Sequence, residues 1–161
     1  MSTNTLTFPK PATLLPHRPP MLLVDEIVSY EPGVSLTAKT QVNADMPFFK
    51  GHFPGYPMLP GVILVEMMFQ TCGLFGRMEM IENQIGTASG ENISDKKMMG
   101  RAIKIDKTTF VKPVFPNSEL TIVVFIKQKF MDFSVYDGKV LDAQNEVVAK
   151  GNITVHLTKP S

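Results

Sequence analysis

The sequence predicts an α+β domain in which an antiparallel β-sheet wraps around one long helix. Segments rich in β-branched and aromatic residues, separated by short turns, flank a single apolar run with helical spacing from Val62 to about Met80. With 161 residues, of which 43% are hydrophobic, the chain is long enough for one domain with a substantial core. A sheet that surrounds this helix buries the most apolar surface with the fewest elements.

The first 42 residues are predicted to form an irregular segment and a β-hairpin. Residues 1–12 are expected to be irregular, with a short helical turn around Ala12 to Leu15. Met21 to Tyr30 is a predicted strand, because it is largely apolar and precedes the turn sequence Glu31-Pro32-Gly33. Val34 to Val42 is rich in β-branched residues and alternates in character, which predicts the second strand.

A proline-rich loop precedes the helix. The four prolines between Pro47 and Pro60 remove amide donors, so regular structure is not expected there. Pro60 and Gly61 open the helix, since proline is tolerated in a first helical turn. Residues 82–100 contain glycines and show little periodicity, which predicts a mobile loop. Four further strands are predicted at Ala102 to Val111, Glu119 to Phe130, Phe133 to Asp142 and Val147 to Leu157, with turns at Pro113 to Ser118 and Ala143 to Glu146.

Composition excludes several classes of protein. A formal net charge of +1 argues against a general nucleic-acid binder. The single cysteine, Cys72, excludes an internal disulfide framework and fits a reducing compartment. The N-terminus lacks the basic-then-apolar order of a secretory signal, and no apolar run approaches the roughly 18 residues of a membrane span. We therefore expect a cytoplasmic protein with a single domain over residues 1–161.

Glu66 is the most informative residue, because it is a carboxylate within the apolar run from Gly61 to Phe69. A carboxylate in apolar surroundings is costly when charged, so shielding from water favours its protonated form and a role as proton donor. A helical rise of about 1.5 Å per residue puts Glu66 roughly 9 Å into the helix. Gln70 lies four residues later on the same face, where it could orient the carboxyl.

His52, in the proline-rich loop, is the predicted partner of Glu66. Its imidazole could act as a base near neutral pH. The free amides of Gly61 and Val62, together with the helix macrodipole, would polarise a carbonyl oxygen at the helix start. A base, an acid and a carbonyl-binding helix end suit removal of a proton next to a carbonyl with loss of a β-hydroxyl.

Structural roles are also open for these residues. A lone loop histidine is more often structural than catalytic, and Glu66 could form a buried salt bridge with an arginine on a neighbouring strand. His17 is expected to cap the chain beside Arg18 or Asp25. His156 is expected at the surface, at the end of a strand. Neither has metal-ligand spacing with a cysteine or carboxylate, so no metal site is predicted.

Several segments resemble bacterial 3-hydroxyacyl-acyl-carrier-protein dehydratases of the FabZ type. Leu15 to Asp25, with the sequence Leu-Pro-His-Arg-Pro-Pro-Met-Leu-Leu-Val-Asp, is similar to their N-terminal motif. Pro47 to Gly55 resembles their catalytic-histidine loop, and Pro60 to Glu66 resembles the start of their central helix. Lys104 to Val114 is similar to the strand after that helix, so the resemblance covers roughly residues 13–157.

The resemblance implies a hotdog fold and an obligate homodimer, which could assemble further into a trimer of dimers. In this family, the histidine of one subunit works with the carboxylate of the other. Carried over, His52 removes the C2 proton of a (3R)-3-hydroxyacyl group held on the phosphopantetheine of acyl carrier protein. Glu66 of the partner chain protonates the departing 3-hydroxyl, and the Gly61 amide holds the thioester carbonyl. The product is a trans-2-enoyl thioester, and no metal or organic cofactor is implied.

The resemblance also suggests finer assignments. Glu66 in place of aspartate points to the branch that dehydrates without isomerising the double bond. Departures from the family pattern, such as Pro116-Asn117-Ser118 where Pro-Gly-Asp is usual, could mark a specialised pathway such as a polyene or secondary lipid. The candidate tunnel residues are Phe49, Met58, Leu59, Ile63, Met67 and Phe69. The candidate cations for carrier-protein docking are Lys96, Lys97, Arg101 and Lys104.

Two other functions are weighed against dehydration in fatty-acid or related lipid biosynthesis. A hotdog acyl thioesterase could use Glu66 to activate water, but His52 would then lack a clear task. A non-catalytic acyl-binding module would be expected to have lost the acid/base pair, whereas both residues are present. The sequence therefore favours a hydro-lyase.

Overall fold

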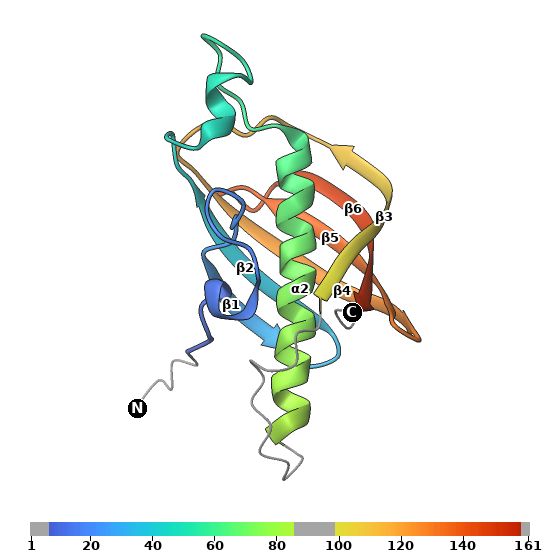
Figure 1. Cartoon of the computed structure of the whole chain (residues 1–161). Helices are drawn as coiled ribbons and strands as arrows, with labels where there is room; N and C mark the ends of the chain where they lie inside the picture. The colour runs from blue at the N-terminus through green and yellow to red at the C-terminus, as the bar shows by residue number, and fades with distance from the viewer. Residues whose placement is uncertain (1–6, 86–98, 159–161) are drawn as a thin grey trace.

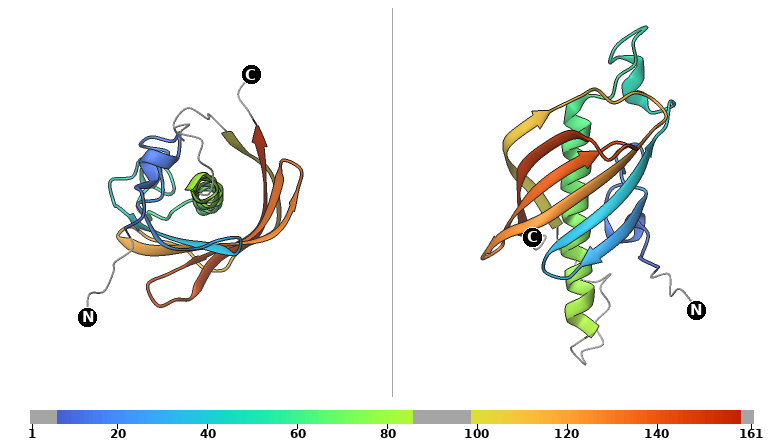
Figure 2. Two further views of the ribbon diagram at one scale, coloured as in Figure 1. Left: turned by 90° about the horizontal axis from the view of Figure 1, so that it is seen from below. Right: turned by 180° about the vertical axis from the view of Figure 1, so that it is seen from behind.

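A long helix lies in the concave face of one antiparallel sheet in the computed structural model, which describes residues 7–85 and 99–158. The sheet has six strands in the order β1-β2-β4-β5-β6-β3, and an end-on view shows it curving around the helix (Figure 2). This confirms the predicted α+β class and hotdog arrangement. The elements are α1 (Pro11–Leu14), β1 (Glu26–Glu31), β2 (Ser35–Val42), the 3-10 helix η1 (Pro47–Lys50), α2 (Gly61–Ile85), β3 (Met99–Phe110), β4 (Ser118–Phe130), β5 (Phe133–Leu141) and β6 (Val147–Thr158).

Helix α2 forms the centre of the core: it lies along the concave face of the sheet (Figure 1), and many of its apolar residues are buried. Phe75 is fully buried, and its ring makes edge contacts with Tyr30 at 5.7 Å and Tyr136 at 5.5 Å between centroids. Burial of each such side chain contributes about 1.5–3 kcal/mol relative to exposure. The other fully buried residues of α2 include Met67, Met68 and Leu74.

The inner face of the sheet follows the alternation expected of strands. On β2, Leu36 and Ala38 are completely buried, whereas their sequence neighbours are partly exposed. Across the strand pair they lie opposite Val124 and Ile122 of β4, which are buried too. These cross-strand pairs form the floor on which α2 packs, and they fix the register of the sheet.

Strand β3 is an edge of the sheet and is largely exposed. Within the described residues it pairs with β6 alone, so its other edge has no strand beside it. Apolar side chains on β3 are open to solvent in the isolated chain, with Ile103 49% and Ile105 44% exposed. A long exposed edge with apolar side chains is a surface for pairing with another chain.

Two predicted boundaries were wrong. The first strand begins at Glu26 and not at Met21, because the Leu23 amide donates its hydrogen bond to the Gln70 side chain and not to a neighbouring strand. The loop expected over residues 82–100 was predicted too long at both ends, since 82–85 continue α2 and 99–100 belong to β3. Residues 86–98 lie outside the described part of the chain.

The N-terminal predictions are also refined. The helical turn expected near Ala12 is confirmed as α1, so residues 11 and 12 are helical and not irregular as expected. Residues 1–6 lie outside the described part. None of the helices in the described ranges has the length and apolar character needed to cross a membrane.

Candidate active site

The loop that carries His52 extends beyond the N-terminal end of α2 (Figure 1). Proline starts η1, and the His52 amide closes that turn by donating to the Phe48 carbonyl at 3.2 Å. Phe53 and Tyr56 then exchange two backbone hydrogen bonds of 3.0 Å, which form a tight turn. Gly55 has φ +76°, a conformation that glycine adopts without strain. The loop is therefore ordered by its own backbone.

One ring nitrogen of His52 is held by the backbone, and no partner for the other is found in the described residues. Nδ1 lies 2.8 Å from the Met58 carbonyl oxygen, which can only accept a hydrogen bond, so Nδ1 carries the proton. The Met58 amide in turn donates to the His52 carbonyl at 2.8 Å. The neutral ring is thereby set with an unprotonated Nε2, the form in which histidine accepts a proton.

Glu66 lies in the second turn of α2 with its side chain 27% exposed. It is therefore less shielded than the apolar sequence around it suggested, because this part of the helix borders a cavity and not the sheet. Oε1 of Glu66 accepts a hydrogen bond from Gln70 Nε2 at 3.0 Å and lies 3.4 Å from His17 Nε2. The arginine salt bridge considered as an alternative is replaced by this histidine contact.

Gln70 orients Glu66, and its side-chain amide makes three hydrogen bonds. Its Oε1 accepts from the Leu23 amide at 2.9 Å, and its Nε2 donates to the Met21 carbonyl at 2.6 Å as well as to Glu66. The amide orientation is unambiguous, because a backbone N–H can only donate and a carbonyl can only accept. With 1% exposure, Gln70 is a buried polar group with its hydrogen-bonding capacity used.

His17 is the site residue that sequence reasoning missed. The expectation that it caps the chain beside Arg18 or Asp25 was wrong: its Nε2 faces Glu66, and Arg18 instead donates to the Leu15 and His17 carbonyls. No local pattern tells which helix residue a side chain in an irregular segment will meet. His156 is partly exposed near the end of β6 and stacks on Phe133 at 4.5 Å between centroids.

The start of α2 offers two backbone donors, and β3 packs closely against it. The amides of Gly61 and Val62 precede the first intrahelical bonds, and no partner for either is found in the described residues. A Cβ on Gly61 would lie 2.8 Å from the Phe110 ring of β3, so that glycine lets β3 approach the helix end. The helix end is therefore open for a polar ligand beside an apolar ring.

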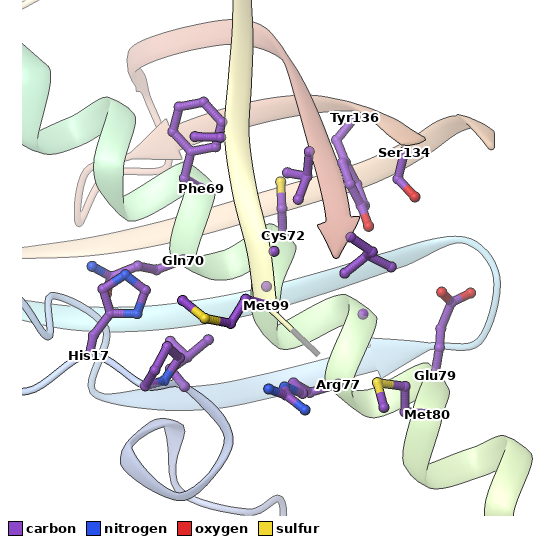
Figure 3. Close-up of a pocket in the computed structure, with 18 of the residues that line it drawn as sticks. His17, Phe69, Gln70, Cys72, Arg77, Glu79, Met80, Met99, Ser134 and Tyr136 are labelled. Atoms are coloured by element: carbon purple, nitrogen blue, oxygen red, sulfur yellow. The ribbon is translucent and has the colours of Figure 1, made fainter. Parts of the chain in front are cut away.

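A cavity of about 360 Å³ runs along the exposed side of α2 (Figure 3). Figure 3 shows His17 and Gln70 side by side near one end, and Arg77, Met80 and Glu79 further along the helix. The walls come from α2, the N-terminal segment and strands β3, β4, β5 and β6. Gly73 and Gly76 lie on the helix side and add no side-chain volume.

Two titratable groups in the cavity wall, Cys72 and Tyr136, are held in their neutral forms. Burial raises the pKa of the Cys72 thiol well above its ordinary value, which keeps it protonated and unreactive. Burial likewise raises the pKa of the Tyr136 phenol. Within the described ranges, no group of three or more histidine, cysteine or carboxylate side chains is arranged to bind a metal.

The predicted tunnel and docking residues have different surroundings. Of the six candidate tunnel residues, Phe69 lines the cavity, whereas Phe49, Leu59, Ile63 and Met67 are buried in the hydrophobic core and Met58 is half-buried in the histidine loop. Arg101 and Lys104 lie exposed on β3, where Lys104 pairs with Asp106 at 2.9 Å. Lys96 and Lys97 lie outside the described residues.

His52 and Glu66 have separate contacts in the described part of the chain. His52 is not among the residues that line the cavity at Glu66, and no hydrogen bond or ion pair joins the two in the part of the chain that the structure describes. Each side chain is nevertheless set by its own backbone or side-chain contacts.

Residues 15–152 match the FabA-like domain family, a span that includes the His52 loop, Glu66, strands β1 to β5 and the first half of β6. The chain belongs to the FabA-like family. It is 37% identical over 144 residues to a protein of Pseudoalteromonas translucida described as 3-hydroxyacyl-[acyl-carrier-protein] dehydratase FabZ, covering 86% of this chain and 89% of that one. A FabZ of the same description from an Anaeromyxobacter species is 40% identical over 117 residues, which cover 72% of this chain and 68% of that one.

Solved structures support the fold of this FabA-like chain. A chain of the dehydratase heterocomplex ApeI:P from Xenorhabdus doucetiae superposes with a TM-score of 0.76 at 18% identity, over 96% of this chain and 93% of that one. The PaaI protein of E. coli gives a TM-score of 0.59 at 17% identity, over 81% and 80% of the two chains. At these identities the likeness concerns the fold alone.

Proposed function

We propose that this FabA-like protein is a hydro-lyase that converts (3R)-3-hydroxyacyl-acyl-carrier-protein to trans-2-enoyl-acyl-carrier-protein. The observation that carries the proposal is that each of the two predicted groups is held by its own contacts: Nδ1 of His52 by the Met58 carbonyl, and Oε1 of Glu66 by Gln70. The relatives described as FabZ dehydratases, which are aligned over most of this chain, point to the same reaction.

The reaction then follows from the roles of three groups. Nε2 of His52 accepts the C2 proton, and the electron pair of the C2–H bond forms the C2=C3 double bond. The C3–O bond breaks, and the hydroxyl leaves as water with the proton of the protonated Glu66 carboxyl. The Gly61 amide and the helix end stabilise negative charge on the thioester oxygen as the C2 proton departs. Return of a proton from the His52 imidazolium to the Glu66 carboxylate, through solvent, resets the site.

We propose that the two residues come from different subunits of an obligate homodimer. His52 and Glu66 do not contact each other in one chain, and the unpaired edge of β3 carries exposed Ile103 and Ile105. Pairing of β3 with β3 of a second copy would extend the sheet and bury these residues. The histidine of one subunit would then face Glu66 of the partner subunit. A trimer of dimers is a larger assembly consistent with this interface.

We assign the cavity along α2 to the acyl chain. It starts beside Glu66 and is bordered by Phe69 and by apolar residues of β3 and β6. The other candidate tunnel residues would act by supporting this wall. The carrier protein would approach over β3, where Arg101 and Lys104 offer positive charge to an acidic partner. A cytoplasmic location, with a role in fatty-acid or related polyene and lipid biosynthesis, fits this substrate.

One assay separates dehydration from the alternatives. The purified protein is incubated with a 3-hydroxyacyl thioester, and the ultraviolet absorbance of the enoyl thioester and the release of free thiol are followed together. Dehydration raises the absorbance without releasing thiol, whereas a thioesterase releases thiol. Thiol release without enoyl absorbance would overturn the proposal, and neither signal would leave the protein as an acyl-binding module. Product analysis by chromatography also shows whether the double bond is isomerised.

A further inference from the structure

The two oxygens of Glu66 have different surroundings. Both nitrogen contacts, from Gln70 Nε2 at 3.0 Å and His17 Nε2 at 3.4 Å, are made with Oε1. No contact with Oε2 is found in the described residues. Since Gln70 presents N–H groups in this position, Oε1 is held as an acceptor. A protonated Glu66 carboxyl would therefore carry its proton on Oε2.

The position of His17 is fixed by the backbone around it. Arg18 reaches back to the carbonyl of Leu15 at 2.9 Å and to that of His17 at 2.6 Å, which closes a small ring around the residue. The amides of Met21 and Leu22 donate to the Arg18 carbonyl at 2.9 and 3.1 Å. The imidazole thus approaches Glu66 from a hydrogen-bonded segment in a different part of the sequence.

The ring contacts of His17 do not suit a purely structural role. Its Nδ1 is buried and has no hydrogen-bond partner in the described chain, so the ring has Glu66 as its polar contact. A structural histidine usually satisfies both nitrogens, because an unpaired buried polar atom opposes folding. A role of the His17 ring in holding the Glu66 carboxyl would explain why Nδ1 is buried without a partner.

We propose that His17 is a positioning residue for Glu66. Together with Gln70 it holds Oε1, so that Oε2 carries the proton that leaves with the substrate hydroxyl. This inference rests on the proposed dehydratase function for its consequence, but the contact itself does not. His17 acts through Glu66 and does not touch the reacting atoms.

The kinetic test compares two substitutions in two backgrounds. His17→Leu removes the donor, whereas His17→Gln retains an N–H group of similar reach. With 3-hydroxyoctanoyl N-acetylcysteamine thioester as the probe, we expect His17→Leu to lower kcat about 10-fold with KM changed less than about 2-fold. His17→Gln should recover most of this loss. In a Glu66→Gln background, measured at high enzyme concentration, His17→Leu should change the residual rate less than about 2-fold.

The outcomes that overturn the inference are distinct from failure of the enzyme assignment. If His17→Leu lowered kcat by the same factor in both backgrounds, the effect would be a general structural one. A wild-type kcat in His17→Leu would show that His17 has no role. Size-exclusion profiles and thermal unfolding identify a variant that fails to fold, in which case the histidine ring spectra described next decide. If the wild-type protein does not dehydrate the probe, long-range ¹⁵N–¹H spectra of the histidine rings test the contact. His17 Nε2 signals should shift in Glu66→Gln, and an unchanged spectrum would refute it.

Discussion

Gln70 and Leu23 are joined by a hydrogen bond of 2.9 Å although 47 positions separate them in the chain. The bond ties the irregular N-terminal segment to the middle of α2. The same Gln70 side chain donates to Glu66, so one buried amide both closes the fold and orients the candidate acid. Stability and function are coupled at this residue.

Gln70→Ala should destabilise the protein by about 2–4 kcal/mol, because it leaves the Leu23 amide and the Met21 carbonyl without partners and creates a small cavity. Guanidinium unfolding at one fixed protein concentration measures the change. Gln41→Ala, at an exposed position of β2, is the matched control and should change stability by less than about 0.5 kcal/mol. Equal unfolding midpoints for the two variants would contradict the role of this bond.

His52→Ala and Glu66→Gln should each lower kcat by a factor of about 10² to 10⁴, since each removes one proton-transfer group. The fold should persist, because His52 lies in a loop outside the core and Glu66→Gln preserves shape. Circular dichroism and size-exclusion chromatography check the fold. Full activity in either variant would disprove its assigned role.

Mixing these two inactive variants tests whether the site is shared between subunits. After random exchange, half of the dimers carry both chains, and each such dimer contains one site with an intact His52 and an intact Glu66. Recovery should therefore approach about one quarter of the wild-type rate. Mass spectrometry of tagged chains verifies the exchange. Verified exchange without recovery would place both groups of a site in one subunit.

Ile105→Lys should convert the dimer into monomers, because it introduces a charge on the edge proposed for pairing. Val28→Lys on β1 is a matched control, since Val28 is also 44% exposed but lies on the opposite edge of the sheet. Light scattering coupled to size exclusion measures the mass. A halved mass for Val28→Lys and not for Ile105→Lys would put the interface on β1.

Gly76→Leu should shorten the acyl site without harming the fold. A Cβ at this position meets no described atom within 4 Å, and replacement of a glycine within a helix stabilises it by about 0.5–1 kcal/mol. We expect kcat/KM to fall at least about 10-fold for long 3-hydroxyacyl thioesters and to stay unchanged for a four-carbon substrate. Gly76→Ala is the control, which should stabilise the helix and spare both substrates. An equal fall in kcat/KM for short and long substrates would argue against this cavity as the acyl site.

Asp142 should contribute to resistance against acid. Its pKa is lowered by hydrogen bonds from the Lys112 ammonium and the Glu146 amide, which stabilise its charged form. Because the pKa of Asp142 is lowered in the folded protein, its charged form contributes to folding stability above about pH 4, the ordinary pKa of aspartate. This contribution is lost as the pH falls through the lowered pKa of the folded state. Asp142→Asn should thus unfold more easily than wild type at pH 6, with the difference shrinking towards pH 2. Unfolding at a series of pH values measures this difference, and a difference in stability between the two proteins that stayed constant from pH 6 to pH 2 would contradict the prediction.

Much of the fold could be predicted because its signals are local. The helix start at Pro60-Gly61, the alternation of Val34 to Val42 and the turns around Pro32 and Pro116 depend on residues near one another in the chain. The first strand was predicted five residues too early, since the long-range bond from Leu23 to Gln70 competes with sheet pairing and leaves no local trace.

The chain by itself determined which groups are available for chemistry: a loop histidine, a carboxylate in an apolar helix and a helix end with free amides. The tertiary structure decided how they are held. It revealed that His17 approaches Glu66, that Gln70 is held by Leu23 and Met21, and that the Met58 carbonyl holds Nδ1 of His52. The reason is physical: residue types and spacings specify local backbone preferences, whereas contacts between distant segments arise only when the sheet closes around α2 and brings them within hydrogen-bond reach.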